Sequence, residues 1–485
     1  MRQIIKLLRT TNSDITQQLN QLYVIVFQNF KMFFTKKPSQ SLMKVNKRCK
    51  FADIKTDITM KYSTIPSTLF VKNRSKLAGK LPSGSLAILH SNFETPRNGD
   101  AFFAFRQQSD VFYLSGVDQE DTILVLFPDC PNPNFREFIF VKETNEQIAV
   151  WDGARLTPNQ VYEVSGIKNV FWYHEFWQTI HAVMLMAEKI MVNLNENDRF
   201  LSEVNYSNFW LTEKLKSKYP AHQFGRLAPI LSNLRMQKEM EEIELLKEAI
   251  DITHKGLLRA LKFIKPGVME YEVEAELIHE FVRNKSKGFA FDPIIASGES
   301  ACVLHYIENN KQCKDGDLML LDFGAEYANY NGDLTRCIPV NGKFSKRQKE
   351  VYNAVLDVQK FAKTVLKSGK TLPDYHNEVC QYTNEKLIQL GLLSSQDVKD
   401  NPKAFMKYFM HGTSHHLGLD VHDVMHRFEP IPENSVLTIE PGIYIPQEGI
   451  GVRIENDVWL SKEGMVDFMD SFPIEVEEIE DAMNS

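Results

Sequence analysis

The N-terminal part of the chain alternates short apolar runs with amphipathic stretches. Residues 85–90 (SLAILH) and 122–127 (TILVLF) have the length and composition of buried strands. Residues 138–141 and 189–192 suit two further strands, and residues 175–188 carry apolar side chains at helical spacing before the last of them. This mixture predicts an α/β domain, in which helices pack on a sheet.

A domain boundary is predicted near residues 229–233, because the pattern then becomes that of a long amphipathic helix. Apolar residues recur mostly at steps of three or four from residue 236 to residue 261, with Glu and Lys between them. A Pro-Gly pair at 266–267 ends this helix, and residues 270–284 predict a second one.

The last third of the chain predicts mainly strands, over residues 318–322, 334–340, 436–439 and 451–460, with another helix over 346–366. Long helices followed by strands that short loops connect are typical of an α+β domain. The sequence therefore predicts two domains of different architecture.

Charge is unevenly distributed along the chain. The formal net charge is -7, but residues 1–59 carry 11 Lys and Arg against 3 Asp and Glu, and the remainder carries 45 against 60. An acidic body argues against nucleic acid as a partner. No early apolar run approaches the roughly 20 residues of a membrane span, so no membrane association is expected. Six scattered cysteines without a CxxC pair predict reduced thiols and a cytoplasmic location.

Two carboxylates lie eleven residues apart around a predicted turn. Asp322 closes an apolar strand, where an unpaired charge is costly, and Asp333 begins the next strand. Asn329 and Asn331 supply turn chemistry between them. A hairpin would bring the two carboxylates side by side, where they repel each other unless a cation lies between them. Taken alone, the pair fits equally well an interpretation without a metal, in which Asp333 is a turn residue and Asp322 caps the end of a strand.

Four of the 13 histidines lie within twelve residues, at His411, His415, His416 and His422. A lone histidine is more often a core or surface residue than a ligand, but four together indicate metal binding or acid–base chemistry. Two carboxylates follow, Glu440 at the end of a strand and Glu455 within an apolar strand. In isolation, Glu455 would be interpreted as the ion-pair partner of Arg453.

Two Asp, one of the histidines and two Glu form a donor set that suits two divalent cations. Four carboxylates balance the charge of two such ions, and one imidazole completes the set. An oxygen-rich set favours harder metals such as Mn²⁺. Two ions about 3.5–4 Å apart lower the pKa of a shared water and polarise a carbonyl group. The sequence thus predicts a hydrolytic two-metal centre.

The order of these motifs resembles the pita-bread metallopeptidases: two Asp separated by ten residues, then HGxSH, EPG and RIE. Within that group the chain is similar to aminopeptidase P, in residues 298–309, in the block HGTSHHLGLDVHD at 411–423 and in RNGDAFFAFRQQSDVFYLSG at 97–116. The resemblance implies an α/β N-terminal domain and an α+β catalytic domain of the creatinase/methionine aminopeptidase type. It covers roughly residues 60–480.

The resemblance divides the chain into a basic extension (1–59), an N-terminal domain (60–233) and a catalytic domain (234–485). Because the resemblance begins at Met60, it favours translation starting there, although the basic leader also fits an organellar transit peptide. The implied activity is that of an Xaa-Pro aminopeptidase, which releases the residue preceding a proline from the N-terminus of peptides. The family also implies a homo-oligomer, a dimer or a tetramer.

The metal ligands that the resemblance implies are Asp322, Asp333, His415, Glu440 and Glu455, with Mn²⁺ as the expected metal. Asp322 would bind one ion through both oxygens, and Asp333 and Glu455 would bridge the two ions. His415 and Glu440 would complete the coordination of the other ion. Glu440 is also the expected general base.

The resemblance also implies roles toward the substrate. His305 and His422 would flank it and stabilise the oxyanion of the tetrahedral intermediate. Arg453 and Tyr444 would steady that intermediate and the ligands, and His411 would line the pocket for the proline ring. Asp100 would bind the free amine, although it equally fits a surface Asp in a Gly-Asp turn.

Prolidase, which cleaves Xaa-Pro dipeptides, is the nearest alternative because it uses the same five ligands. The stretch at 97–110 and Ser414 before His415 favour aminopeptidase P instead. Non-catalytic peptide-binding modules of this fold have lost their ligands, and a creatinase-like hydrolase would not keep the full set. All five residues are present in this chain.

Overall fold

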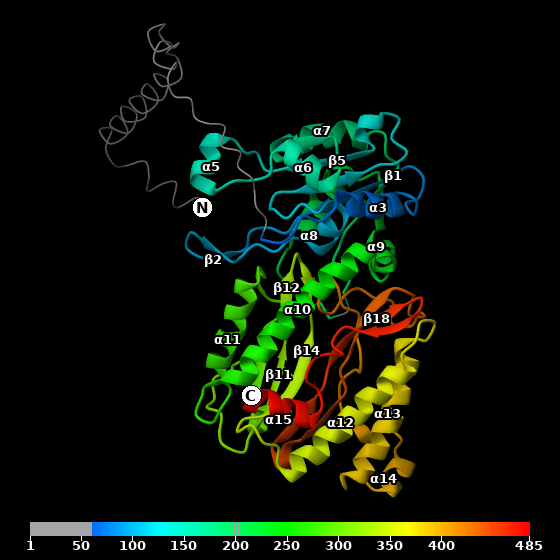
Figure 1. Cartoon of the computed structure of the whole chain (residues 1–485). Coiled ribbons are helices and arrows are strands. Elements are labelled where there is room, and N and C mark those ends of the chain that lie inside the picture. The colour runs from blue at the N-terminus through cyan, green and yellow to red at the C-terminus, as the bar shows by residue number, and fades with distance from the viewer. Residues whose placement is uncertain (1–60, 198, 201–202) are drawn as a thin grey trace, which may run out of the picture. The chain divides into compact units, whose positions relative to one another are not determined.

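The computed structural model describes residues 61–197, 199–200 and 203–485 (Figure 1). The described residues belong to one compact unit, Ile58–Ser485, which contains the two predicted domains. The predictions about residues 1–59 concern residues outside the described ones. Among the described residues, no helix has both the length and the hydrophobicity that crossing a membrane requires.

The N-terminal domain is built on a six-stranded mixed sheet of order β6-β5-β4-β1-β7-β8. Its strands are β1 (Ser85–His90), β4 (Ile123–Leu126), β5 (Glu137–Val141), β6 (Val170–Trp172), β7 (Lys189–Val192) and β8 (Gln223–Arg226). The β1–β4 and β4–β5 pairs are antiparallel, whereas β1–β7, β5–β6 and β7–β8 are parallel. The four strands predicted from apolar runs are confirmed within one residue at each end.

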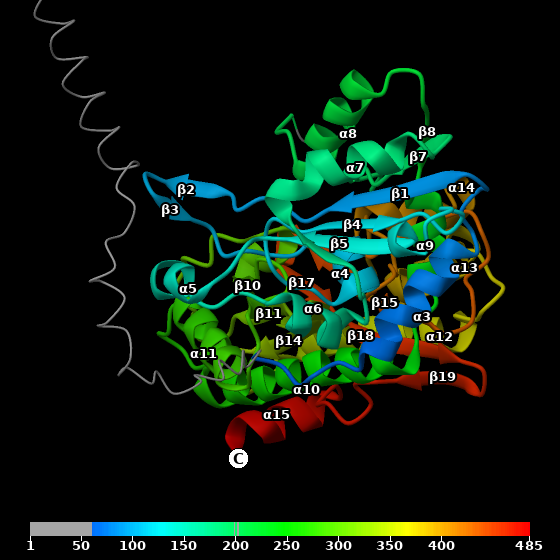
Figure 2. The ribbon, with the colours of Figure 1, turned by 90° about the horizontal axis from the view of Figure 1, so that it is seen from above.

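Helices cover both faces of this sheet (Figure 2). On one face lie α3 (Ser67–Ala78), α4 (Ser109–Ser115) and α6 (Pro158–Ser165), and on the other lie α7 (Phe176–Met184) and α8 (Ser207–Lys218). Alternate residues of β1 enter different cores: Ala87 and Leu89 pack in one and Leu86 and Ile88 in the other. Because both faces are buried, the strand is a continuous apolar run.

The predicted boundary at residues 229–233 lies inside a short helix, α9 (Ala228–Arg235). The long helix α10 (Met240–Phe263) follows, begins at a capping box between Glu239 and Glu242, and packs against α11 (Glu270–Arg283). Both predicted helices are confirmed, except that residues 236–239 precede α10.

Antiparallel strands form the centre of the C-terminal domain. Three three-stranded sheets have the orders β10-β11-β14, β15-β18-β19 and β13 (Tyr330–Asn331)-β12 (Ala325–Tyr327)-β9 (Gly288–Phe289), and β16 pairs with β17. The strands are β10 (Ile294–Ser297), β11 (Leu318–Phe323), β14 (Leu334–Pro339), β15 (Ser435–Ile439), β16 (Gly442–Ile445), β17 (Ile450–Arg453), β18 (Asn456–Ser461) and β19 (Gly464–Asp467).

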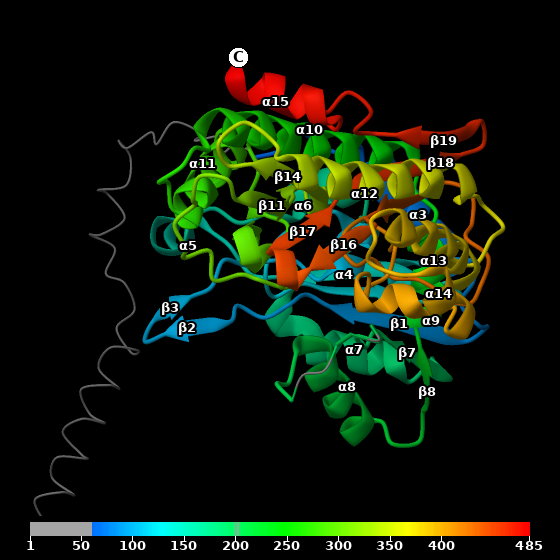
Figure 3. The ribbon, with the colours of Figure 1, turned by 90° about the horizontal axis from the view of Figure 1, so that it is seen from below.

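Helices enclose these strands from outside. In Figure 1, α10 and α11 flank them on one side and α12 (Lys346–Val365) and α13 (Leu372–Gln389) on the other. Figure 3 shows α12 beside β16 and β17, which it contacts, and the C-terminal helix α15 (Val476–Asn484) against α10. The two predicted architectures, α/β and α+β, are both present.

The prediction of one strand over residues 451–460 is wrong. The chain forms β17, which pairs with β16, and then β18, which pairs with β15. Glu455 lies between the two strands and forms an isolated bridge with Thr335. The change of partner is a long-range event that the local apolar pattern does not contain.

Candidate metal centre

A hairpin brings the first two predicted ligands together. Strands β11 and β14 pair antiparallel with Asp322 opposite Thr335, and Asp333 directly precedes β14. The chain reverses at Ala328 and Asn329, both of which have positive φ. The predicted hairpin is therefore present, and the charge of Asp322 acts on the Asp333 carboxyl.

The five predicted metal ligands lie at four strand ends and in one loop, and these segments converge on one place, the candidate metal centre. Donor atoms of Asp333, His415 and Glu455 lie within 4.8 Å of one another. His415 Nε2 lies 3.5 Å from Asp333 Oδ2 and 3.7 Å from Glu440 Oε1. Glu440 directly follows β15, as the sequence predicts. Carboxylates from distant parts of the chain therefore face a single histidine.

Crowding raises the carboxyl pKa values in this cluster. Burial, and then the charge of Asp322, raises the pKa of Asp333 to about 6 against the pull of His415. Burial raises the pKa of Glu440 to about 7, and burial together with the charge of Asp333 holds that of Glu455 well above its ordinary value. Buried carboxyl groups this close together repel one another when they are all ionised, and a bound cation would stabilise their ionised forms.

The unsatisfied atoms of the cluster also suit a cation. Asp322 Oδ1 is buried and has no hydrogen-bond partner, although such atoms are costly to leave unpaired. His415 bonds to the backbone oxygen of His416 through Nδ1, at 2.9 Å, which leaves Nε2 directed at the carboxylates. The donor set therefore fits divalent metal ions.

Arg453 connects the ligands to the rest of the site. Its guanidinium forms an ion pair with Asp322, donates to Thr335 Oγ1 at 3.2 Å, and donates to the Tyr444 hydroxyl at 2.8 Å. The interpretation that pairs Arg453 with Glu455 is thus wrong, because the guanidinium reaches across to β11. Glu455 instead accepts a hydrogen bond of 2.6 Å from Thr335.

His411 forms one wall of the site. Its Nδ1 lies 2.8 Å from the Gly412 carbonyl oxygen and its Nε2 lies 2.8 Å from the Tyr444 hydroxyl. Phe409 packs edge-on against the ring at 4.9 Å. Burial and the charge of Arg453 lower the pKa of His411 to about 3, so the ring is neutral near neutral pH.

The two predicted flanking histidines lie near each other. The His422 ring packs edge-on against His415 at 4.5 Å. Although His422 reaches solvent, the surrounding protein and then His415 lower its pKa to about 3. His305 lies in an exposed turn after the helix Gly298–Cys302, close enough to lower the pKa of both His411 and His422. His305 is therefore near enough to both rings to interact with them electrostatically.

Asp100 lies elsewhere. It occupies the exposed turn between β2 (Pro96–Asn98) and β3 (Ala101–Phe102), where Gly99 has positive φ. Among the described residues, it shares no hydrogen bond or ion pair with the metal centre. Its role in amine binding stays a prediction.

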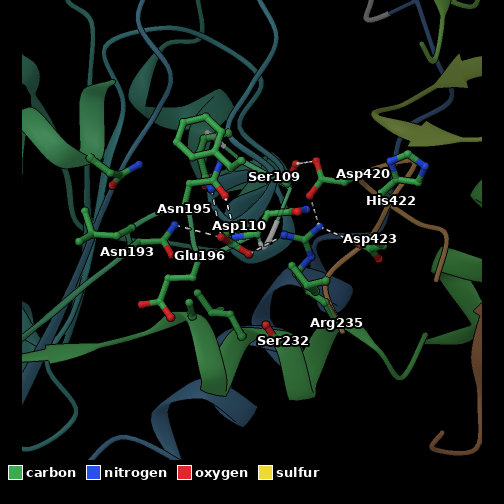
Figure 4. Close-up of a pocket in the computed structure, with 18 of the residues that line it drawn as sticks. Ser109, Asp110, Asn193, Asn195, Glu196, Ser232, Arg235, Asp420, His422 and Asp423 are labelled. Atoms are coloured by element: carbon green, nitrogen blue, oxygen red, sulfur yellow. Dashed lines mark hydrogen bonds and ion pairs between the residues drawn. The ribbon is translucent and has the colours of Figure 1, made fainter. Parts of the chain in front are cut away.

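A cavity of about 670 Å³ opens beside His415 and His422 (Figure 4). Its walls come from the N-terminal domain, from α9, and from the loop that carries His422. The labelled lining residues are Ser109, Asp110, Asn193, Asn195, Glu196, Ser232, Arg235, Asp420, His422 and Asp423. Of the predicted ligands, His415 therefore borders the same cavity as the N-terminal domain.

Comparison with known proteins agrees with this geometry. The model of metallopeptidase family M24 matches residues 244–462, and that of the aminopeptidase P N-terminal domain matches residues 70–192. An Xaa-Pro aminopeptidase from Haemophilus influenzae is 33% identical over 87% of this chain and 98% of its own length. The chain belongs to the Xaa-Pro aminopeptidase family.

Solved structures of the family have the same fold. An Escherichia coli aminopeptidase P in complex with substrate gives a TM-score of 0.78 at 31% identity, over 87% of this chain and 99% of that one. A zinc-substituted form of the same aminopeptidase P, in complex with product, gives the same values. Membership in the family confirms the resemblance that the motifs indicate.

Two residues of the centre were missed in the sequence. Thr335 donates to Glu455, and Asp457 accepts a hydrogen bond of 3.0 Å from the backbone N–H of Asp333. Each stands two residues after a predicted ligand, and each lies fully buried. A polar side chain at that spacing within an apolar strand was the available signal.

Proposed function

We propose that this protein is an Xaa-Pro aminopeptidase that hydrolyses the bond before a proline at the second position of peptides. The convergence of Asp322, Asp333, His415, Glu440 and Glu455 carries this proposal. It is supported by relatives and solved structures with that activity in their names, which match almost the whole of their own length.

Two divalent ions, when bound, would supply Lewis acidity toward the carbonyl and the attacking water. Mn²⁺ is the proposed metal, because the donor set is rich in carboxylate oxygen. Glu440 is the proposed general base, since it faces His415 and also lies 3.6 Å from His411 at the wall of the site. Its carboxylate would take the proton of the attacking water.

Two histidines would act on the substrate. His422 would donate an N–H to the oxyanion without carrying a charge, and His305, from the turn after residue 302, would have the same role. Arg453 and Tyr444 would fix His411 and Asp322 through the hydrogen bonds described above.

The Xaa-Pro bond favours a site of this kind. It has no N–H to donate and its ring is rigid, so recognition depends on packing. The ring of His411, which packs edge-on against Phe409 and Tyr444, offers a wall of largely apolar character. This wall is the proposed contact surface for the proline ring.

A length series of peptides tests the proposal. Purified protein with added Mn²⁺ is incubated with Xaa-Pro, Xaa-Pro-Yaa and a longer Xaa-Pro peptide, with Xaa-Ala-Yaa as control. Release of the first residue from the tripeptide and the longer peptide, with little from the control, is expected. Cleavage of the dipeptide alone would make the protein a prolidase, and binding of metal without any cleavage would make it a peptide-binding module.

Assembly and location are proposed more broadly. We propose a homo-oligomer, a dimer or a tetramer, whose mass light scattering would measure; a monomeric mass would contradict it. We propose a cytoplasmic location, which the free Cys130, Cys302, Cys313, Cys337 and Cys380 support. A fluorescent fusion of the whole chain tests the location, and accumulation in an organelle would contradict it.

A further inference from the structure

The loop that carries His422 is held from outside the catalytic strands. Arg106 of the N-terminal domain donates to the Leu419 carbonyl oxygen at 2.6 Å and to Asn329 Oδ1 at 2.7 Å. Ser109, the first residue of α4, donates to Asp420 Oδ1 at 2.7 Å. The N-terminal domain therefore binds this loop two and three residues before His422, at Asp420 and Leu419.

Arg235 fixes the same loop on both sides of His422. Its guanidinium donates to Asp420 Oδ2 at 2.7 Å and forms a second ion pair with Asp423 (Figure 4). Asp423 is fully buried and also accepts a bond of 2.7 Å from Lys238 Nζ. His422 thus lies between two carboxylates that one buried arginine holds.

The arginine is itself tied to the N-terminal domain. Arg235 Nη1 donates to Asp110 Oδ1 at 2.8 Å, and Asn193 and Gln108 each donate to Asp110 Oδ2 at 3.0 Å. Helix α4 therefore reaches the His422 loop by two routes, through Ser109 and through Asp110 and Arg235.

One ion pair of this network is partly open to solvent. The Asp420 side chain is 44% exposed, so its pair with Arg235 is more screened, and contributes less to the free energy of unfolding, than the buried pair of Arg235 with Asp423. Yet Asp420 has two partners and lies two residues before His422. Because these contacts converge next to a group that acts on the substrate, we infer that they hold that group in place. Misplacing a catalytic group by about 1 Å lowers the reaction rate roughly 100-fold.

We propose that the N-terminal domain positions His422 for the reaction, with Ser109, Asp420 and Arg235 as positioning residues. This inference rests on the proposed function, because His422 acts on the substrate there. In this arrangement the N-terminal domain borders the cavity and also sets the position of His422, so that its contacts affect the rate of the reaction.

The test compares variants of the full-length, metal-loaded protein. Asp420→Asn and Ser109→Ala remove contacts to the loop, and Ser115→Ala is the matched control because its hydroxyl bonds within α4, to the Val111 carbonyl oxygen at 2.7 Å. We expect Asp420→Asn to lower kcat/KM for an Xaa-Pro-Yaa peptide about 10- to 100-fold, with little change in Tm. Ser109→Ala should have a smaller effect, and Ser115→Ala should behave like the wild type.

A double-mutant cycle separates positioning from a structural role. If Asp420 acts through His422, the Asp420→Asn change should cost almost nothing further in a His422→Ala background. The same fold-loss in both backgrounds would overturn the proposal, and so would a wild-type kcat/KM in Asp420→Asn. Arg235→Gln is not used to test the proposal, because removing one partner of a buried ion-pair network would also destabilise the fold.

A readout independent of activity keeps the two proposals distinct. The imidazole ring signals of His422 in ¹H–¹⁵N NMR of the protein loaded with diamagnetic Zn²⁺, assigned by their loss in His422→Ala, should shift in Asp420→Asn and Ser109→Ala but not in Ser115→Ala. Unchanged signals in the first two variants would overturn the positioning role. A wild-type protein that cleaves none of the peptides contradicts the proposed function alone, whereas the ring signals still decide the positioning.

Discussion

At the scale of single residues, environment separates otherwise similar carboxyl groups into different roles. Asp322 forms an ion pair with an arginine, Glu455 accepts a hydrogen bond from a threonine, and Glu440 is the member that stays partly accessible beside His411. A general base needs access to the substrate as well as proximity to the metals. These environments favour Glu440 as the base.

Replacing Glu440 with Gln tests this assignment. The amide keeps the shape of the side chain but cannot accept the proton, so kcat should fall by roughly 100- to 10,000-fold. Circular dichroism should show an intact fold. Glu433→Gln, at an exposed position before the same strand, is the control and should stay active. Near-normal turnover of the Glu440 variant would remove it from this role.

Thr335 offers a second test at this scale, through metal binding. Thr335→Val keeps the shape but removes the hydrogen bond to Glu455, which should weaken metal affinity about 10- to 100-fold. Thr335→Ser keeps the hydroxyl and should bind metal normally. Titration calorimetry with Mn²⁺ measures both, and equal affinities of the two variants would contradict the expectation.

At the scale of elements, the β11–β14 hairpin depends on a close backbone approach. A Cβ at Gly324 would lie 1.6 Å from the Gly332 carbonyl oxygen, a distance that no side chain tolerates. Because the obstacle is backbone, the strands themselves would have to separate. The spacing of Asp322 and Asp333 is therefore linked to the absence of a side chain at this glycine.

Gly324→Ala should lower the free energy of unfolding by about 3 kcal/mol or more and weaken metal binding as well. Gly79→Ala is the control, since a Cβ there meets nothing nearer than 3.6 Å. Chemical denaturation with and without metal measures both effects. A Gly324 variant as stable as the control variant would show that the hairpin adapts.

The sequence predicted elements well where the pattern is local. Residues 85–90 form β1 as predicted, because a strand buried on both faces shows as an unbroken apolar run. The helix α13 was not singled out, although Thr371 caps it and Pro373 occupies its first turn. The strand at 451–460 was wrongly predicted as continuous, because pairing partners are chosen across long sequence distances.

In the candidate site, too, the local features were predictable from the sequence and the long-range contacts were not. Its ligands were recognisable as motifs, since the chemistry needs those residue types in a fixed order. The pairing of Arg453 with Asp322, and the contacts of Arg235 with three carboxylates, join segments far apart in the chain. Such contacts leave no periodic signal and appear only when the chain is folded.

At the scale of the whole molecule, metal and pH should act on stability together. In the metal-free protein the pKa of Asp333 lies at about 6 and that of Glu440 at about 7, above the values of 3.8 and 4.5 expected without the fold. The folded state then binds more protons than the unfolded state over this window. Stability of the metal-free protein should therefore fall as pH rises from about 4 to 7.

Metal ions need the ionised carboxylates, so their stabilising effect should grow over the same range. We expect the gap in Tm between protein with excess Mn²⁺ and protein treated with a chelator to widen between about pH 5 and pH 8. Differential scanning fluorimetry at fixed metal concentration measures the gap. A gap independent of pH would show that these carboxyls do not bind the ions.

Arg235 also bears on how such proteins can be recombined. Its side chain binds Asp110 from the N-terminal domain and Asp423 from the catalytic domain. A chimaera joined at residue 233 would bring in a foreign partner for a buried cation, and the graft would tolerate only donors that supply an acid at the matching place on α4. Exchange of either domain between relatives should therefore be constrained by this one shared charge.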